Sequence, residues 1–245
     1  MLSMKDQIAA VKDALSAPRI RTYEVAAGTC GSEDPSALDL YLWNAQISGA
    51  FLAPLHICEV VIRNAVADAL EPKYGAKWVW APAFEQSLPS PSSGYSPRQD
   101  LLNARRNART VGKVIPELKF AFWQRMFTSR HDERLWHPYL LQVMPGLDSS
   151  KPVNQLRKGI YDDLEEIRSL RNRIAHHEPI ITRNLSDDFI RITRLIAYRS
   201  QLTADWMTSH NETQIQSMLQ SKPHHPKLIV GKVSVFSDAH AHASV

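Results

Sequence analysis

The residues best suited to chemistry lie in one stretch, Arg171 to Pro179, which reads Arg-Asn-Arg-Ile-Ala-His-His-Glu-Pro. Arginine binds phosphate oxygens through a planar fork of N–H donors. Histidine accepts and donates protons near neutral pH. An arginine and a histidine held together are the minimum set of groups for cutting RNA without a metal ion. The stretch therefore predicts phosphate chemistry, provided that these side chains meet a substrate.

Such a reaction needs two proton transfers and one stabilised anion. A histidine takes the proton from a ribose 2′-hydroxyl, and that oxygen attacks the adjacent phosphorus while an acid protonates the departing 5′-oxygen. Arginine stabilises the charge that builds on the phosphate oxygens. One catalytic histidine per chain fills only one of the two roles, so we expect a two-fold dimer that places two copies across a shared cleft. No cofactor is required.

The spacing of these residues decides whether they can meet. On an ideal helix Arg171 and His176 lie about 140° apart around the axis. They converge only if the helix unwinds at its end, and Pro179 favours this because it biases Glu178 away from helical geometry. Asn172 and His176 are four residues apart and share a face, so Asn172 is expected to orient the imidazole.

A purely structural interpretation explains the same residues. Cations near the C-terminus of a helix are stabilised by its dipole, by about 0.3–1 kcal/mol each. Arg168, Arg171 and Arg173 could also form ordinary surface ion pairs. The carboxylates within reach are those of Glu165, Glu166 and Glu178. On this interpretation the cluster only ends a helix.

The composition predicts an all-α fold. Hydrophobic residues make up 44% of the 245 residues, and there are only 9 glycines, with few alternating runs. We expect one helical domain over residues 1–222 and a tail over 223–245 that is weakly ordered or forms a short strand. A loop is expected over 18–35, and a mobile Pro/Ser-rich loop over 86–97. The predicted helices cover residues 4–15, about 35–70 (kinked or split by Pro54), 98–113, 116–127, 152–177 and 189–207.

Charge and cysteine content limit the classes of partner. The formal net charge of +4 suits a nucleic-acid partner without requiring one. Cys30 and Cys58 have no spacing typical of a metal site or a disulfide framework, and no metal site is predicted. No run of about 18 uncharged apolar residues is present, so we expect no membrane span and a cytoplasmic protein.

Two further groups of residues could contribute to a site. Glu59 and Arg63 are four residues apart on a predicted helix and could form an intrahelical pair of a few tenths of a kcal/mol. Alternatively, both project into the same polar cleft as Arg171 and His176. A denser basic region contains Arg105, Arg106 and Arg109. Its default interpretation is a solvated helix face, and the alternative is a groove that follows RNA phosphates.

Three segments together resemble a known family. LRNRIAHHEPI resembles the R-x-x-x-x-H motif of HEPN-domain proteins, in the form R-N-x-x-x-H. LHICEVVIRNAVADAL and FAFWQRMFTSRHDERLW are similar to the early helix and the aromatic segment of bacterial Abi-like proteins, which belong to the abortive-infection class. The resemblance covers roughly residues 40–200.

The resemblance implies a HEPN-like helical bundle with additional helices, dimerisation, and metal-independent RNA cleavage. By position it makes Arg171 the phosphate-binding arginine, His176 the catalytic histidine and Asn172 the polar residue after the arginine, with His177 and Glu178 as supporting residues. The expected function is a toxin-like endoribonuclease in anti-phage defence, with RNA as substrate and an antitoxin as a potential partner.

Two alternatives stay open at this point. The first is a catalytically inactive module that binds RNA or a nucleotide and acts through a partner. The second is a helical dimerisation protein in which the Arg/His cluster only builds an interface.

Overall fold

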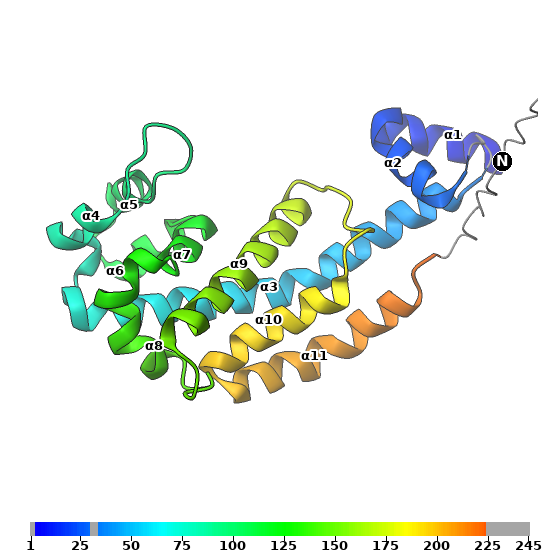
Figure 1. Ribbon diagram of the computed structural model, residues 1–245. Coiled ribbons are helices and arrows are strands. Elements are labelled where there is room, and N and C mark those ends of the chain that lie inside the picture. Colours follow the sequence, from blue (N-terminus) through cyan, green and yellow to red (C-terminus); the bar gives the residue numbers. More distant parts are fainter. Residues whose placement is uncertain (1–2, 30–33, 224–245) are drawn as a thin grey trace, which may run out of the picture. The chain divides into compact units, whose positions relative to one another are not determined.

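The computed structural model describes residues 3–29 and 34–223, and every regular element in those ranges is a helix (Figure 1). The prediction of an all-α fold is confirmed for this part of the chain. Cys30 and the tail beyond Pro223 lie outside the described residues, so the predicted tail strand does as well.

The chain divides into two compact units, with Tyr41 closing the N-terminal unit and Leu42–Lys222 forming the larger one. The prediction of one domain over residues 1–222 stays a prediction.

The N-terminal unit contains α1 (Met4–Leu15), α2 (Ala17–Ala27) and the start of α3 (Ser36–Tyr74). The predicted helix over 4–15 is confirmed. The predicted loop over 18–35 is wrong for its first half, since α2 occupies it. Pro18 lies in the first turn of α2, where its missing N–H has no helical partner to lose.

Helix α3 runs without a break for 39 residues, so the predicted split at Pro54 does not occur. The Asp34 carboxylate accepts a hydrogen bond from the Ser36 N–H, at 2.9 Å. At the other end Gly75 has a left-handed φ of 85° and donates to the Glu71 carbonyl at 2.7 Å. A proline removes one helical hydrogen bond, and the long helix retains the others.

Within the larger unit, α3 carries a buried apolar stripe at helical spacing. The stripe consists of Trp43, Ile47, Phe51, Leu55, Cys58 and Ile62. Among the described residues, α3 is also the one helix long and apolar enough to cross a membrane, and 33% of its most apolar window is buried. A helix at the centre of a bundle has the same composition. The absence of a membrane partner and a cytoplasmic location stay predictions.

A group of short helices follows α3 and encloses an aromatic core. Phe84, Phe122 and Trp123 are buried, and the rings of Phe127 and Trp136 stack at 4.4 Å. The helices are η1 (Trp78–Trp80), α4 (Pro82–Ser87), α5 (Pro97–Arg105), α6 (Val111–Val114), η2 (Ile115–Glu117), α7 (Phe120–Met126), η3 (Ser129–His131), η4 (Asp132–Trp136) and α8 (His137–Val143).

Two predictions for this region need correction. The helix predicted over 98–113 ends at Arg105 and resumes only at Val111, and the helix predicted from Pro116 begins at Phe120. A non-helical segment, 88–96, joins α4 to α5. The mobility expected of this loop stays a prediction.

Three longer helices complete the larger unit: α9 (Val153–Ala175), α10 (Leu185–Arg199) and α11 (Gln201–Gln220). The helix predicted over 189–207 divides at Ser200, whose hydroxyl accepts the Thr203 N–H at 3.2 Å and caps α11. Figure 1 shows α10 and α11 side by side. The Trp43 indole of α3 donates to the Met218 carbonyl at 2.7 Å, which attaches α3 to α11.

Candidate functional site

The Arg171–Pro179 stretch forms the end of α9. The helix ends at Ala175, and the last turn closes with two hydrogen bonds, from Glu178 N–H to the Arg173 carbonyl (2.8 Å) and from His177 N–H to the Ile174 carbonyl (3.1 Å). This pair is the Schellman arrangement of a helix C-terminus. The predicted helix end near His176 or His177 is confirmed.

The connection after α9, residues 176–184, is attached to three elements. The Arg173 guanidinium donates to the Pro179 carbonyl at 2.6 Å. The Ile180 N–H donates to the side-chain oxygen of Asn44 on α3 at 2.8 Å, and Asn44 is only 5% exposed. The Lys222 ammonium donates to a backbone carbonyl of the same connection, that of Ile181, at 2.6 Å.

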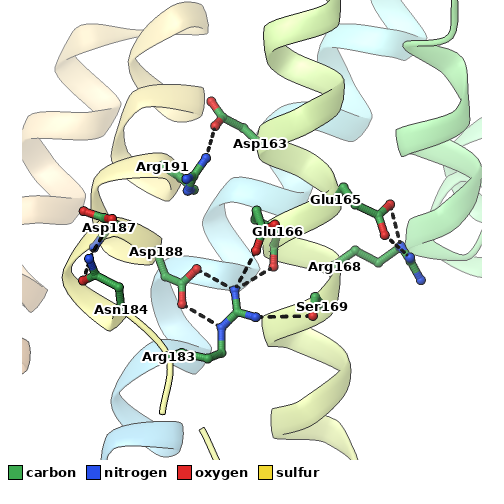
Figure 2. Close-up of polar contacts among 10 residues, drawn as sticks. All are labelled: Asp163, Glu165, Glu166, Arg168, Ser169, Arg183, Asn184, Asp187, Asp188 and Arg191. Atoms are coloured by element: carbon green, nitrogen blue, oxygen red, sulfur yellow. Dashed lines mark hydrogen bonds and ion pairs between the residues drawn. The ribbon is translucent and has the colours of Figure 1, made fainter. Parts of the chain in front are cut away.

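Arg183 anchors the far end of this connection (Figure 2). Its guanidinium binds both oxygens of Asp188, at 2.9 and 2.8 Å, and reaches back to Glu166 on α9 at 3.2 Å. Asp188 is buried, and its hydrogen bonds raise the pKa of Arg183 above the ordinary value. The charge-assisted bonds hold the start of α10 against α9.

A second ion-pair group fixes α9 beside α10. The Asp163 carboxylate of α9, 5% exposed, accepts from Arg191 at 2.9 Å and from Arg194 at 2.7 Å. Figure 2 shows Asp163 and Arg191 facing each other from these two helices. These ion pairs fix α9 beside α10, and the position of the last turn of α9 follows from this.

That last turn forms one wall of a cavity of about 650 Å³, here called the α3–α9 cavity. Its apolar lining includes Leu52 and Ile57 from α3 and Ile174 from α9. Three lining residues carry polar groups, and these are His56, Glu59 and Arg171. The volume falls in the range of small-ligand sites, about 300–1,000 Å³.

Glu59 does not compete for Arg171, because it is paired within α3. Its carboxylate binds Arg63, one turn along the helix, and the two side chains are 15% and 18% exposed. The predicted intrahelical pair therefore forms. Arg63 is not among the residues that line the cavity. With Glu59 neutralised by its pair, the remaining fixed charge on the cavity wall is the positive charge of Arg171.

Arg171 differs from the other arginines of α9. Arg157 binds Asp132, Arg168 binds Glu165, and Arg173 binds the Pro179 carbonyl. The Arg171 side chain is exposed and has no hydrogen-bond or ion-pair partner within residues 3–29 and 34–223. Its five N–H donors are therefore available to an anion that enters the cavity.

His176 and Asn172 lie at the same helix end. The His176 N–H donates to the Asn172 carbonyl at 2.9 Å, but no side-chain hydrogen bond joins the two in the described structure. The expected orienting contact from Asn172 is thus not formed. His176 is exposed and follows Ala175, which lines the cavity, while neither His176 nor Asn172 is itself a lining residue.

The two residues expected to support the site, His177 and Glu178, have different surroundings. His177 has a left-handed φ of 55°, which only a few non-glycine residues adopt, histidine among the more frequent. Glu178 is exposed and lies 3.9 Å from Arg173. Both residues therefore take part in ending α9.

The basic region divides into residues with different surroundings. Arg105 donates to the Val79 carbonyl at 2.7 Å and pairs with Glu85. Its charge is therefore already paired within the fold. Arg106 donates to the Asn103 side chain at 3.0 Å, and Arg109 is exposed. A phosphate-binding role stays a prediction, and Arg105 is the member least able to serve it.

Two observations concern metal binding and catalysis by a cysteine thiolate. Among the described residues, no three His, Cys, Asp or Glu side chains gather in a group that could hold a metal ion. Cys58 is fully buried, and burial raises the pKa of its thiol well above the ordinary value, so it does not supply a thiolate nucleophile.

His56 is the polar lining residue that the sequence did not identify as a site residue. It lies between Leu55 and Ile57 in an apolar run, and such a run suggests a core helix. The signal that could have identified it is helical spacing, since His56 lies one turn from Glu59.

No protein-family model, curated protein or solved structure matches the chain. The functional assignment therefore depends on the site residues themselves and on the motif resemblance.

Proposed function

We propose that the protein is a metal-independent endoribonuclease, a toxin-like effector of the HEPN type that acts on RNA. The observation that carries this proposal is Arg171, an exposed guanidinium without a partner among the described residues, on the wall of a 650 Å³ cavity. A free arginine fork beside apolar walls suits a phosphodiester with an attached base. His176 lies one residue beyond the cavity wall.

In the proposed reaction His176 removes the proton from a ribose 2′-hydroxyl. The oxygen then attacks the adjacent phosphorus, the bond to the 5′-oxygen breaks, and a 2′,3′-cyclic phosphate forms. Arg171 binds the non-bridging phosphate oxygens, whose negative charge grows in the transition state. DNA is not cleaved, because it lacks the attacking hydroxyl.

We further propose that the protein acts as a homodimer with a composite active site. Exposed apolar side chains on α3 support this, since Leu42 and Leu52 are 56% and 57% exposed and Val60 is 38% exposed. Leu52 also lines the α3–α9 cavity, so a partner on this side of α3 would lie next to it. A role in anti-phage defence and an antitoxin partner rest on the motif resemblance alone.

One observation favours a second candidate function, a catalytically inactive module that binds RNA or a nucleotide. His176 does not line the cavity that holds Arg171. Arg171 alone would bind phosphate without any proton transfer at that position. On this alternative the protein still binds RNA but does not cleave it.

The test is cleavage of a mixed-sequence RNA in excess EDTA by the full-length protein. We expect products that end in a 2′,3′-cyclic phosphate, and a rate lower by about 10²–10⁴-fold for His176→Ala. Arg171→Lys should also lose most activity, because lysine keeps the charge but lacks the planar fork.

The matched control is His210→Ala, which removes an exposed histidine of α11 that packs near Trp206. This variant should keep wild-type activity. Cleavage that persists in both His176→Ala and Arg171→Lys would contradict the proposed site. RNA binding without cleavage by the wild type would favour the inactive binding module.

A further inference from the structure

We infer that His56 is the second proton-transfer group of the active site, the acid that protonates the departing 5′-oxygen. This inference rests on the proposed endoribonuclease function and goes beyond it, because it assigns the second role to a residue of the same chain. A dimer is then not needed to supply the second proton-transfer group, and the composite site proposed above would be replaced by a site within one chain. The assignment comes from the cavity lining, in which His56 from α3 and Arg171 from α9 both line the α3–α9 cavity.

The position of His56 on α3 makes it available to a substrate. It is exposed, although its neighbours Leu55 and Cys58 are buried in the core. Within the described residues, its ring has no hydrogen-bond or ion-pair partner that would hold it away from a ligand. The nearby carboxylate of Glu59 is already bound to Arg63, so it does not hold the imidazole of His56 away from the cavity.

The two histidines lie on different elements. His56 projects from the middle of α3, and His176 caps the last turn of α9. Arg171, which also lines the cavity, lies five residues before His176 on α9. A phosphate bound at Arg171 would therefore have His56 on the α3 side of the same cavity, while His176 lies at the C-terminal end of α9. General acid and general base must act on different oxygens, and this arrangement separates them.

The proton balance is complete within the proposed step. His176 accepts the proton of the 2′-hydroxyl as the new bond from oxygen to phosphorus forms. His56, in its protonated form, gives a proton to the 5′-oxygen as the bond from phosphorus to that oxygen breaks. The enzyme ends with His176 protonated and His56 neutral, and exchange with water restores both. No electron transfer or further reactant is needed.

The test compares two substrates of the same sequence. One is ordinary RNA, and in the other the 5′-bridging oxygen at the cleavage position is replaced by sulfur. A thiolate leaves without protonation, so a missing general acid does not slow the second substrate. On ordinary RNA, His56→Ala should reduce the single-turnover rate by about 10²–10⁴-fold. On the sulfur-substituted RNA it should match the wild type, while His176→Ala should be slow on both.

The control variant is Asn64→Ala, another exposed residue of α3, and far-ultraviolet circular dichroism of each variant checks folding. Full activity of His56→Ala on ordinary RNA would overturn the inference and leave the proposed function intact. Slow cleavage of both substrates by folded His56→Ala would also overturn it, because the residue would then not be the acid. A wild type that cleaves neither substrate would overturn the proposed function and this inference together.

Discussion

At the scale of single residues, His177 and Arg171 show that the end of α9 departs from what helix stability alone would select. The C′ position of a Schellman motif is usually glycine, because a side chain strains the left-handed conformation. Here it is histidine with φ of 55°. Arg171 has no partner among the described residues, while the three other arginines of α9 each have one. Residues in sparsely populated conformations concentrate at functional sites.

The cost of the left-handed backbone can be measured with two variants that both remove the imidazole. His177→Gly should be more stable than His177→Ala by about 1 kcal/mol, since only alanine keeps the Cβ that strains this conformation. Thermal or urea unfolding of the two variants provides the comparison. Equal stabilities would show that the left-handed conformation at residue 177 costs nothing.

At the scale of elements, the connection between α9 and α10 is held by polar contacts at several points. Asn44 of α3 accepts a backbone N–H from its middle, and Arg183 fastens its end to Asp188 and Glu166. Short polar contacts of this kind limit the movement of a loop whose backbone would otherwise be solvated. The last turn of α9 is thereby held at the α3–α9 cavity.

Asn44→Ala should destabilise the protein by about 1–3 kcal/mol, because it leaves the buried N–H of Ile180 without an acceptor. Asn64→Ala, an exposed position on the same helix, should change stability by less than about 0.5 kcal/mol. Urea unfolding gives both values, and hydrogen exchange at Ile180 should accelerate only in Asn44→Ala. An Ile180 amide that stays protected in this variant would rule out the proposed attachment.

At the scale of the whole molecule, the larger unit combines a long central helix with a buried aromatic core and a buried histidine. His131 is 2% exposed, and burial lowers its pKa to about 3, with Arg134 and Arg130 adding to the effect. In the unfolded chain its pKa is about 6.5. The folded state therefore keeps this residue neutral at a pH where the unfolded state binds a proton.

This difference predicts a loss of stability in mild acid. Below pH 6.5 the unfolded state binds a proton that the folded state does not, so the free energy of unfolding falls by up to about 1.4 kcal/mol per pH unit. At pH 5 the loss amounts to about 2 kcal/mol. The effect is absent above pH 6.5. Urea unfolding between pH 7 and pH 5 measures it, above the range in which carboxylates such as Glu165 titrate.

His131→Leu should flatten this pH dependence, whatever it does to stability at pH 7, while His210→Gln at an exposed position should leave it unchanged. An identical slope in wild type and His131→Leu would mean that another group causes the acid sensitivity.

Much of the fold could be predicted because its signals are local. Pro179 marks the end of α9, and the spacing of four residues between Glu59 and Arg63 produces their pair. Predictions were wrong where one local signal is compatible with more than one local structure. Pro18 can lie in a loop or in a first helical turn, and Ser200 can continue a helix or cap a new one. Tertiary packing decides which of the two local structures forms.

The amino-acid sequence by itself determined the helical class, the position where α9 ends and the presence of Arg171 and His176 near that end. These depend on hydrophobic periodicity and on proline, which act over a few residues. The tertiary structure alone decided that Arg171 has no partner among the described residues and that His56 shares the cavity with Arg171. Each of these depends on how α3 and α9 lie against each other, and no local pattern encodes which faces of two helices far apart in the chain will meet.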